Sequence, residues 1–186
     1  MWEWLPIAFG EPNALTKKMS SEECVSEAIR LLKSKNIWMH DTLTRVTRNQ
    51  NMERMASDRS IRTPASNDFS DFKTIFSTHT KLVTIAATSQ QAYKYLQTAM
   101  KLQGLASSNG YAELAAWSKS QPSNSAADET SFKIEKHVRP ISKFDFEGRT
   151  LSIYLLPSPS GRYSNSGKLS AEIYRRVLTD EIPSKT

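Results

Sequence analysis

The chain has 186 residues, of which 38% are hydrophobic, and this length suits one domain with a buried core. Its formal net charge of +6 favours an acidic partner such as nucleic acid, anionic lipid or an acidic protein. The single cysteine, Cys24, excludes an intrachain disulfide and a thiol metal cluster, and it is typical of an intracellular protein of the cytoplasm or nucleus. We expect residues 20–178 to form the domain, between a flexible aromatic segment at 1–19 and a tail at 179–186.

The N-terminal segment is dense in aromatic and aliphatic side chains, and its start lacks the basic region of a secretory signal. One interpretation is that the segment packs into the core or pairs as an edge strand. The other is a membrane anchor, in which Trp2 and Trp4 lie at the lipid–water boundary while Lys17 and Lys18 attract anionic lipid. No apolar run reaches the roughly 18 residues that span a bilayer, so we expect any membrane contact to be peripheral.

A helix is predicted from residue 20 to residue 36, because Ser20 and Glu23 have the spacing of a capping box. Its apolar stripe is expected to face the core, as the stripe of an amphipathic helix usually does. The stripe consists of Val25, Ala28, Ile29 and Leu32.

Residues 37–62 form a basic stretch in which Asp41 is placed to cap a second helix, although the threonines there have low helix propensity. This stretch contains three acidic residues and five arginines. They are Arg45, Arg48, Arg54, Arg59 and Arg62. They have two interpretations, a solvated face or a nucleic-acid or phosphate contact, since guanidinium groups bind phosphate oxygens bidentately.

The clearest unit runs from Thr80 to Gly104. A β-branched run at 82–85 predicts a buried strand, and the pair Thr88 and Gln91 predicts the cap of an amphipathic helix that ends at Gly104. The side chains expected on the solvent face of this helix are Lys94, Gln97 and Lys101. Four apolar residues before this unit are expected to contribute to the same core: Phe69, Phe72, Ile75 and Phe76.

The rest of the chain divides into short elements. A short helix is predicted at 111–117, followed by a polar, mobile loop at about 119–131. Alternation of apolar and polar residues predicts a strand at 132–139 and a hairpin at 144–155 that turns at Glu147 and Gly148. Residues 168–178 fit a helix and a strand about equally, and a turn-like sequence before them favours the strand.

Signatures of enzyme chemistry are missing from the sequence. The three histidines, His40, His79 and His137, are scattered and have no partner at the spacing of a metal site. No nucleophile elbow or glycine-rich phosphate loop occurs. We therefore expect no catalytic residues, no metal, no cofactor and no small-molecule substrate.

The layout resembles the matrix proteins of rhabdoviruses, particularly the short ones of plant-infecting members. The features that carry the resemblance are the strand-to-helix unit LVTIAATSQQAYKYLQTAM, the polar loop at 119–131 and the glycine-led strand GRTLSIYLL, within Phe72 to Leu178. The resemblance implies a non-enzymatic shell protein of the virion that self-associates, binds ribonucleoprotein and lies under a membrane. The lysine-rich N-terminus and Pro-Pro-x-Tyr motif of many animal-virus members are not present in this sequence.

Together these features predict an α+β domain with N-terminal helices, a central strand–helix unit and a small antiparallel sheet mainly from the C-terminal third. The predicted function is a matrix-like assembly protein that self-associates and bridges a ribonucleoprotein to an anionic membrane. The alternative is a basic nucleic-acid-binding protein, such as a nucleocapsid component or an RNA-binding suppressor, that uses the Arg45–Arg62 stretch. A protein-interaction adaptor with neither ligand is a third hypothesis.

Overall fold

The computed structural model describes residues 5–12, 14–15, 19–49, 61–105, 110–119, 134–157 and 167–179. These residues form a mixed α+β fold, as the sequence predicts. The elements are α1 (Leu5–Ala8), α2 (Ser21–Ser34), the short 3₁₀ helix η2 (Ser66–Asp68), α3 (Phe72–Thr78), β1 (Thr84–Ala87), α4 (Gln90–Leu102), α5 (Gly110–Lys119), β2 (Ser142–Phe146), β3 (Arg149–Leu155) and α7 (Gly167–Leu178).

The three described strands form one sheet in the order β1-β3-β2. β2 and β3 make the antiparallel hairpin that the sequence predicts, and its turn places Glu147 at φ 48° and Gly148 at φ 77°. β1 pairs with β3 in parallel, with Thr84 opposite Ser152. The expectation of an antiparallel sheet is therefore wrong for β1, because a long crossover containing α4 and α5 returns the chain in the same direction.

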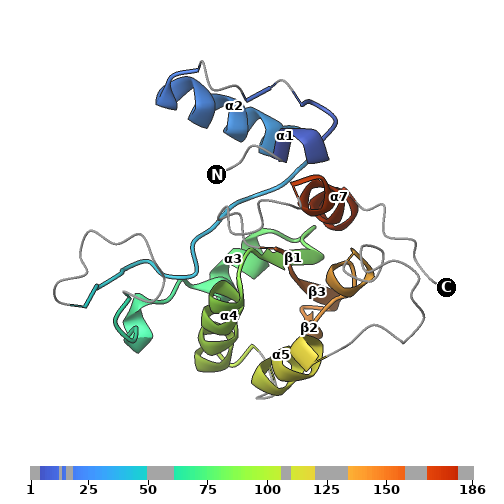
Figure 1. Cartoon of the computed structure of the whole chain (residues 1–186). Helices are drawn as coiled ribbons and strands as arrows, with labels where there is room; N and C mark the ends of the chain where they lie inside the picture. Colours follow the sequence, from blue (N-terminus) through green and yellow to red (C-terminus); the bar gives the residue numbers. More distant parts are fainter. Residues whose placement is uncertain are drawn as a thin grey trace.

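The central strand, β3, is covered on both faces. Leu151, Ile153 and Leu155 pack against a core that includes α3, α4 and α5. Tyr154 and the following Leu156 point the other way, into a second core with α1, α2 and α7. Figure 1 accordingly shows α4 and α5 on one side of the sheet and α7, with α1 and α2 beyond it, on the other.

The central helix follows the prediction in length and termination but differs in detail. Ser89, rather than Thr88, caps α4 through a 3.0 Å hydrogen bond from the Ala92 amide. Gly104 adopts φ +68°, and the amide of Leu105 donates to the Met100 carbonyl at 2.8 Å, which closes the helix with a Schellman motif.

The sequence prediction places one residue of α4 on the wrong face of the helix. Gln97, expected beside Lys94 and Lys101 on the solvent side, is buried. Its amide reaches the Ser142 hydroxyl at 3.4 Å, so a polar side chain in the core has a hydrogen-bond partner there.

Two predicted strands are helical instead. Residues 167–178 form α7, in which Ile173, Tyr174 and Val177 are buried, a helical spacing that the strand interpretation does not explain. The described part of the predicted strand at 132–139 has a helical turn at 134–137. At 168–178 the pattern allowed both structures, and burial of these side chains in the core with α1 selected the helix.

The N-terminal part of the structure packs on α7 but leaves apolar residues exposed. Leu5, Ala8 and Phe9 are buried in the core that contains α7, as the core-packing interpretation expected. The predicted stripe of α2 is only partly right: Ala28 and Leu32 are half-buried and Leu32 packs against this core, whereas Val25 is 59% and Ile29 is 46% exposed. Leu31, which the stripe did not include, is fully buried. None of the helices that the structure describes is long and apolar enough to cross a membrane.

Candidate functional site

The basic stretch forms two paired extended arms rather than the predicted second helix. Leu43 pairs with Phe69 and Arg48 pairs with Ile61 in isolated antiparallel bridges. The Arg62 amide donates to the Thr47 carbonyl at 2.8 Å. Threonines and other β-branched residues at 42–47 favour this extended backbone over a helix.

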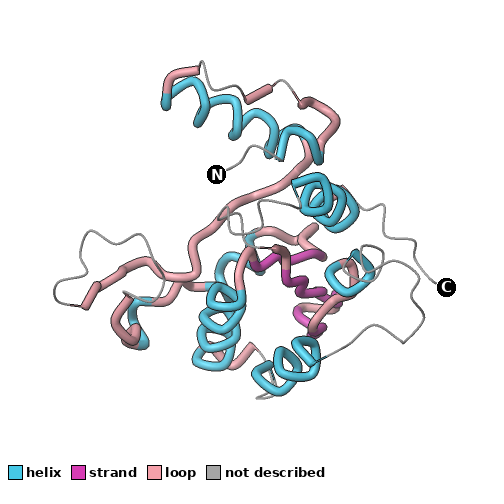
Figure 2. The backbone as a smooth tube through the Cα atoms, in the orientation of Figure 1, coloured by secondary structure: helices cyan, strands magenta, loops and turns pink. Residues whose placement is uncertain are grey.

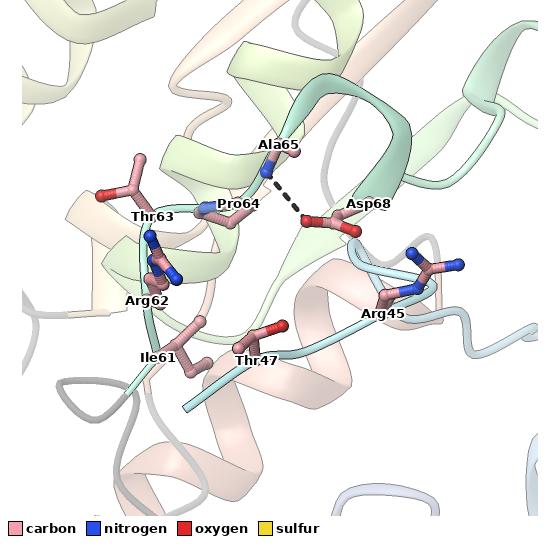
Figure 3. A pocket seen from close by; sticks show the side chains of 8 residues that line it. All are labelled: Arg45, Thr47, Ile61, Arg62, Thr63, Pro64, Ala65 and Asp68. Carbon is pink, nitrogen blue, oxygen red and sulfur yellow. Dashed lines mark hydrogen bonds between the residues drawn. The ribbon is translucent and has the colours of Figure 1, made fainter. Parts of the chain in front are cut away.

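A pocket opens between the two bridges because the arms differ in length. Four residues, 44–47, connect the bridged positions on the first arm, whereas seven residues, 62–68, do so on the second. The second arm takes up part of its extra length as η2. The resulting open pocket has a volume of about 260 Å³ (Figure 3). Its lining residues are Arg45, Thr47, Ile61, Arg62, Thr63, Pro64, Ala65 and Asp68.

The pocket is flanked by cationic side chains. Figure 3 shows Arg62 and Arg45 on opposite sides of it, with Thr47 between them. Both arginines are exposed, and neither forms a side-chain ion pair with another residue that the structure describes. Arg48, at the end of the first arm, is half-buried. Arg45 and Arg62 therefore present their guanidinium groups to solvent rather than to acidic side chains of the described residues.

Asp68 is the one carboxylate among the pocket-lining residues, and it is turned toward the backbone. Its side chain accepts a 2.8 Å hydrogen bond from the Ala65 amide, drawn in Figure 3. The Asp68 carbonyl also accepts bonds from the amide and the hydroxyl of Thr44, at 2.7 and 3.1 Å. With Arg45, Arg48 and Arg62, these arms keep a formal charge of +2.

This arrangement suits an anion with several oxygens. A guanidinium group offers a fixed fork of donors that matches phosphate geometry, so two guanidiniums on opposite sides of an open pocket suit successive phosphates of one chain. The Thr47 hydroxyl adds a neutral donor between the two arginines. The pocket is open, so a chain-like ligand is able to pass along it.

The structure brings together three of the five arginines that the sequence predicted as a phosphate contact. Arg45 and Arg62 line the pocket and Arg48 ends the arm beside it. Arg54 and Arg59 lie outside the described residues, as do the four residues of the predicted membrane anchor. Those four are Trp2, Trp4, Lys17 and Lys18.

Sequence reasoning missed two other polar or aromatic clusters. In the core, the Tyr93 hydroxyl lies 3.3 Å from both the Glu113 carboxylate and the Ser142 hydroxyl, and burial raises the pKa of Tyr93 to about 12. On the surface, the Trp38 ring packs against the His79 ring with centroids 5.1 Å apart. Both clusters join residues distant in the chain, so no local spacing signals them.

The described residues contain no group of three side chains placed to hold a metal ion. Comparison of the chain with models of protein families, with characterised proteins and with solved structures found no match.

Proposed function

We propose that this protein is a non-enzymatic nucleic-acid-binding protein that holds the phosphate backbone in the pocket between Arg45 and Arg62. The observation that supports this function most directly is the pair of exposed arginines on opposite sides of an open pocket, without acidic partners among the described residues. The net charge of +6 adds a long-range attraction for a polyanion.

Fluorescence anisotropy with a labelled RNA tests this function. The double variant Arg45→Ala plus Arg62→Ala should bind at least about ten times more weakly, and the slope of log affinity against log salt should fall by about one per arginine removed. The control is Arg139→Ala plus Lys143→Ala, which removes two exposed cations elsewhere on the chain. An equal loss in both double variants would show non-specific charge attraction and refute the pocket.

A further variant tests whether the two arginines bind phosphate bidentately or through their charge alone. The variant Arg45→Lys plus Arg62→Lys keeps both charges but removes the planar fork of donors. Binding should fall clearly below that of the parent at equal salt, with a nearly unchanged salt slope. Full retention of affinity would mean that only charge matters at these positions.

A second candidate function is the matrix-like role, in which the protein self-associates and bridges a ribonucleoprotein to an anionic membrane as a peripheral protein. Val25 and Ile29 favour it, because they form an exposed apolar pair on one face of α2. Co-flotation with anionic liposomes after nuclease treatment tests the membrane contact. Flotation should fall in Val25→Ser plus Ile29→Ser and in Trp2→Ala plus Trp4→Ala, and unchanged flotation in both would reject it.

A further inference from the structure

Trp38 is the most exposed large hydrophobic side chain among the described residues, with 73% of its surface accessible. One side of its ring is occupied by His79, with ring centroids 5.1 Å apart and ring planes inclined by 40°. The high exposure leaves most of the indole free for a ligand. An accessible aromatic ring is a surface on which an unpaired base can stack.

The backbone that carries Trp38 is fixed to α3 and the residues before it. The Ser70 hydroxyl donates to the Asp41 carbonyl at 2.6 Å, and the Ser70 amide donates to the Thr42 carbonyl at 3.2 Å. The ring of His40 meets Phe72 edge-on, with centroids 6.2 Å apart. Because these contacts hold the segment in place, a ligand that stacks on Trp38 loses little affinity to ordering the protein.

Basic side chains lie close to Trp38 and His79 in the sequence. Lys35 is three residues before Trp38, and Lys81 is two residues after His79. Both lysines are exposed, and neither has an ion pair with a residue that the structure describes. An aromatic surface with lysines beside it is suited to a base and its adjacent phosphates.

The Trp38 surface and the arginine pocket are connected by one extended segment. Trp38 and Arg45 are seven residues apart on the segment 37–49, the loop that leads away from α2 in Figure 2. Fully extended backbone covers at most about 25 Å over that length. Lys73, exposed on α3, adds a cation on the helix that supports this segment. A strand of a few nucleotides is long enough to contact both places.

We infer that the ligand is a single-stranded nucleic acid: one unpaired base stacks on Trp38, supported by His79, while the backbone continues to the pocket of Arg45 and Arg62. This inference rests on the proposed function and adds the strandedness of the ligand and a second contact. In a duplex the bases are paired and stacked on one another, so their faces are not available to an exposed tryptophan.

The probes are a labelled single-stranded RNA of about 12 nucleotides, which is within the usual site size of small single-strand-binding folds, the matching DNA strand, the RNA duplex, and the same single strand with abasic positions. The parent protein should bind both single strands more tightly than the duplex, and the abasic strand about ten times more weakly. Equal affinity for the duplex, or for the abasic strand, would overturn the inference.

Variants of Trp38 make the same test from the side of the protein. Trp38→Ala should weaken binding of the single strand about ten-fold, whereas Trp38→Phe should restore most of the affinity because a ring remains. The matched control is Met39→Ala, which removes the neighbouring exposed side chain. Thermal unfolding should be nearly unchanged in all three variants, since exposed substitutions rarely affect stability.

The outcomes separate this inference from the proposed function. Weak binding by the arginine double variant together with full binding by Trp38→Ala would leave the phosphate pocket standing and overturn the stacking contact. Full binding by both sets of variants would overturn both proposals. If Trp38→Ala lowers liposome flotation but not binding of the single strand, Trp38 contacts lipid and the stacking contact is also overturned.

Discussion

The hydroxyl of Tyr93 donates to the hydroxyl of Ser142 across 3.3 Å, and this hydrogen bond joins α4 to the first residue of β2. The Gln97 amide reaches the same Ser142 oxygen, and Glu113 on α5 lies within hydrogen-bond distance of Tyr93. Four polar side chains from α4, α5 and β2 therefore satisfy one another where the surrounding core is apolar. A network of this kind stabilises one arrangement of the elements because its groups have few other partners.

Tyr93→Phe should destabilise the protein by about 1 kcal/mol, since it removes one donor and leaves a half-satisfied network in place. Urea unfolding measures the change. The matched control is Tyr95→Phe, because Tyr95 is half-buried and its hydroxyl has no hydrogen bond to another described residue. Equal effects of the two variants would show that the network contributes nothing.

His137 should make stability fall as the solution becomes acidic. Burial lowers the pKa of His137, and the Nδ1 atom lies 2.5 Å from the Leu155 carbonyl, to which it donates. Because the pKa is lower in the folded state than in the unfolded state, this contribution is present above the ordinary pKa of about 6.5 and is lost as the pH falls through the folded value.

Chemical unfolding between about pH 7.5 and pH 5, around the ordinary histidine pKa, measures this dependence. His137→Gln should flatten the fall in stability across that range, at the cost of some stability at neutral pH. His40→Gln, which keeps His137 in place, should retain the slope of the parent. A slope that survives the loss of His137 would assign the pH dependence to another group.

Gly104→Ala should destabilise the protein by about 1 kcal/mol, because Gly104 has φ +68° and residues with a Cβ atom rarely adopt that backbone conformation. An added Cβ meets no atom within 4 Å, so the cost is one of backbone conformation and not of space. Gly104→Asn should cost less than Gly104→Ala, since Asn tolerates the left-handed region. Thermal unfolding of the two variants gives the order, and a larger cost for Asn would contradict this explanation.

Leu31→Ala should cost about 2–5 kcal/mol, as large-to-small changes at fully buried positions do. Leu31 holds α2 in the core that contains α7. Val25→Ala on the same helix should change stability by less than about 0.5 kcal/mol, because Val25 is largely exposed. Denaturant titration compares the two losses of stability. A larger loss for Val25→Ala than for Leu31→Ala would favour the apolar stripe predicted from the sequence.

The elements predicted best from sequence are those whose signals are local. The helix α4, which Gly104 terminates, and the hairpin that turns at Gly148 each combine a periodic pattern with a glycine at positive φ. Patterns shared by two structures misled the prediction. Leu169, Ile173 and Val177 fit both a helix and a strand, and only packing against β3 and α1 selects the helix.

The candidate site was predictable in its residue types but not in its geometry. The arginines stand out in composition, but the pocket exists because 62–68 is longer than 44–47 between two bridges, a relationship between distant segments. The contact of Trp38 with His79 crosses about forty residues of chain, so neither residue's neighbours indicate it. Burial of Gln97 depends in the same way on Ser142, which is contributed by β2.

The packing of α1 on α7 also sets an order in time. Leu5, Ala8 and Phe9 pack in a core to which α7 contributes, and α7 begins at residue 167. These side chains therefore lack that part of their burial until the ribosome has made the chain between them. At usual rates of synthesis that interval lasts roughly 10–30 s. During it this apolar segment is accessible to a chaperone or to a second chain.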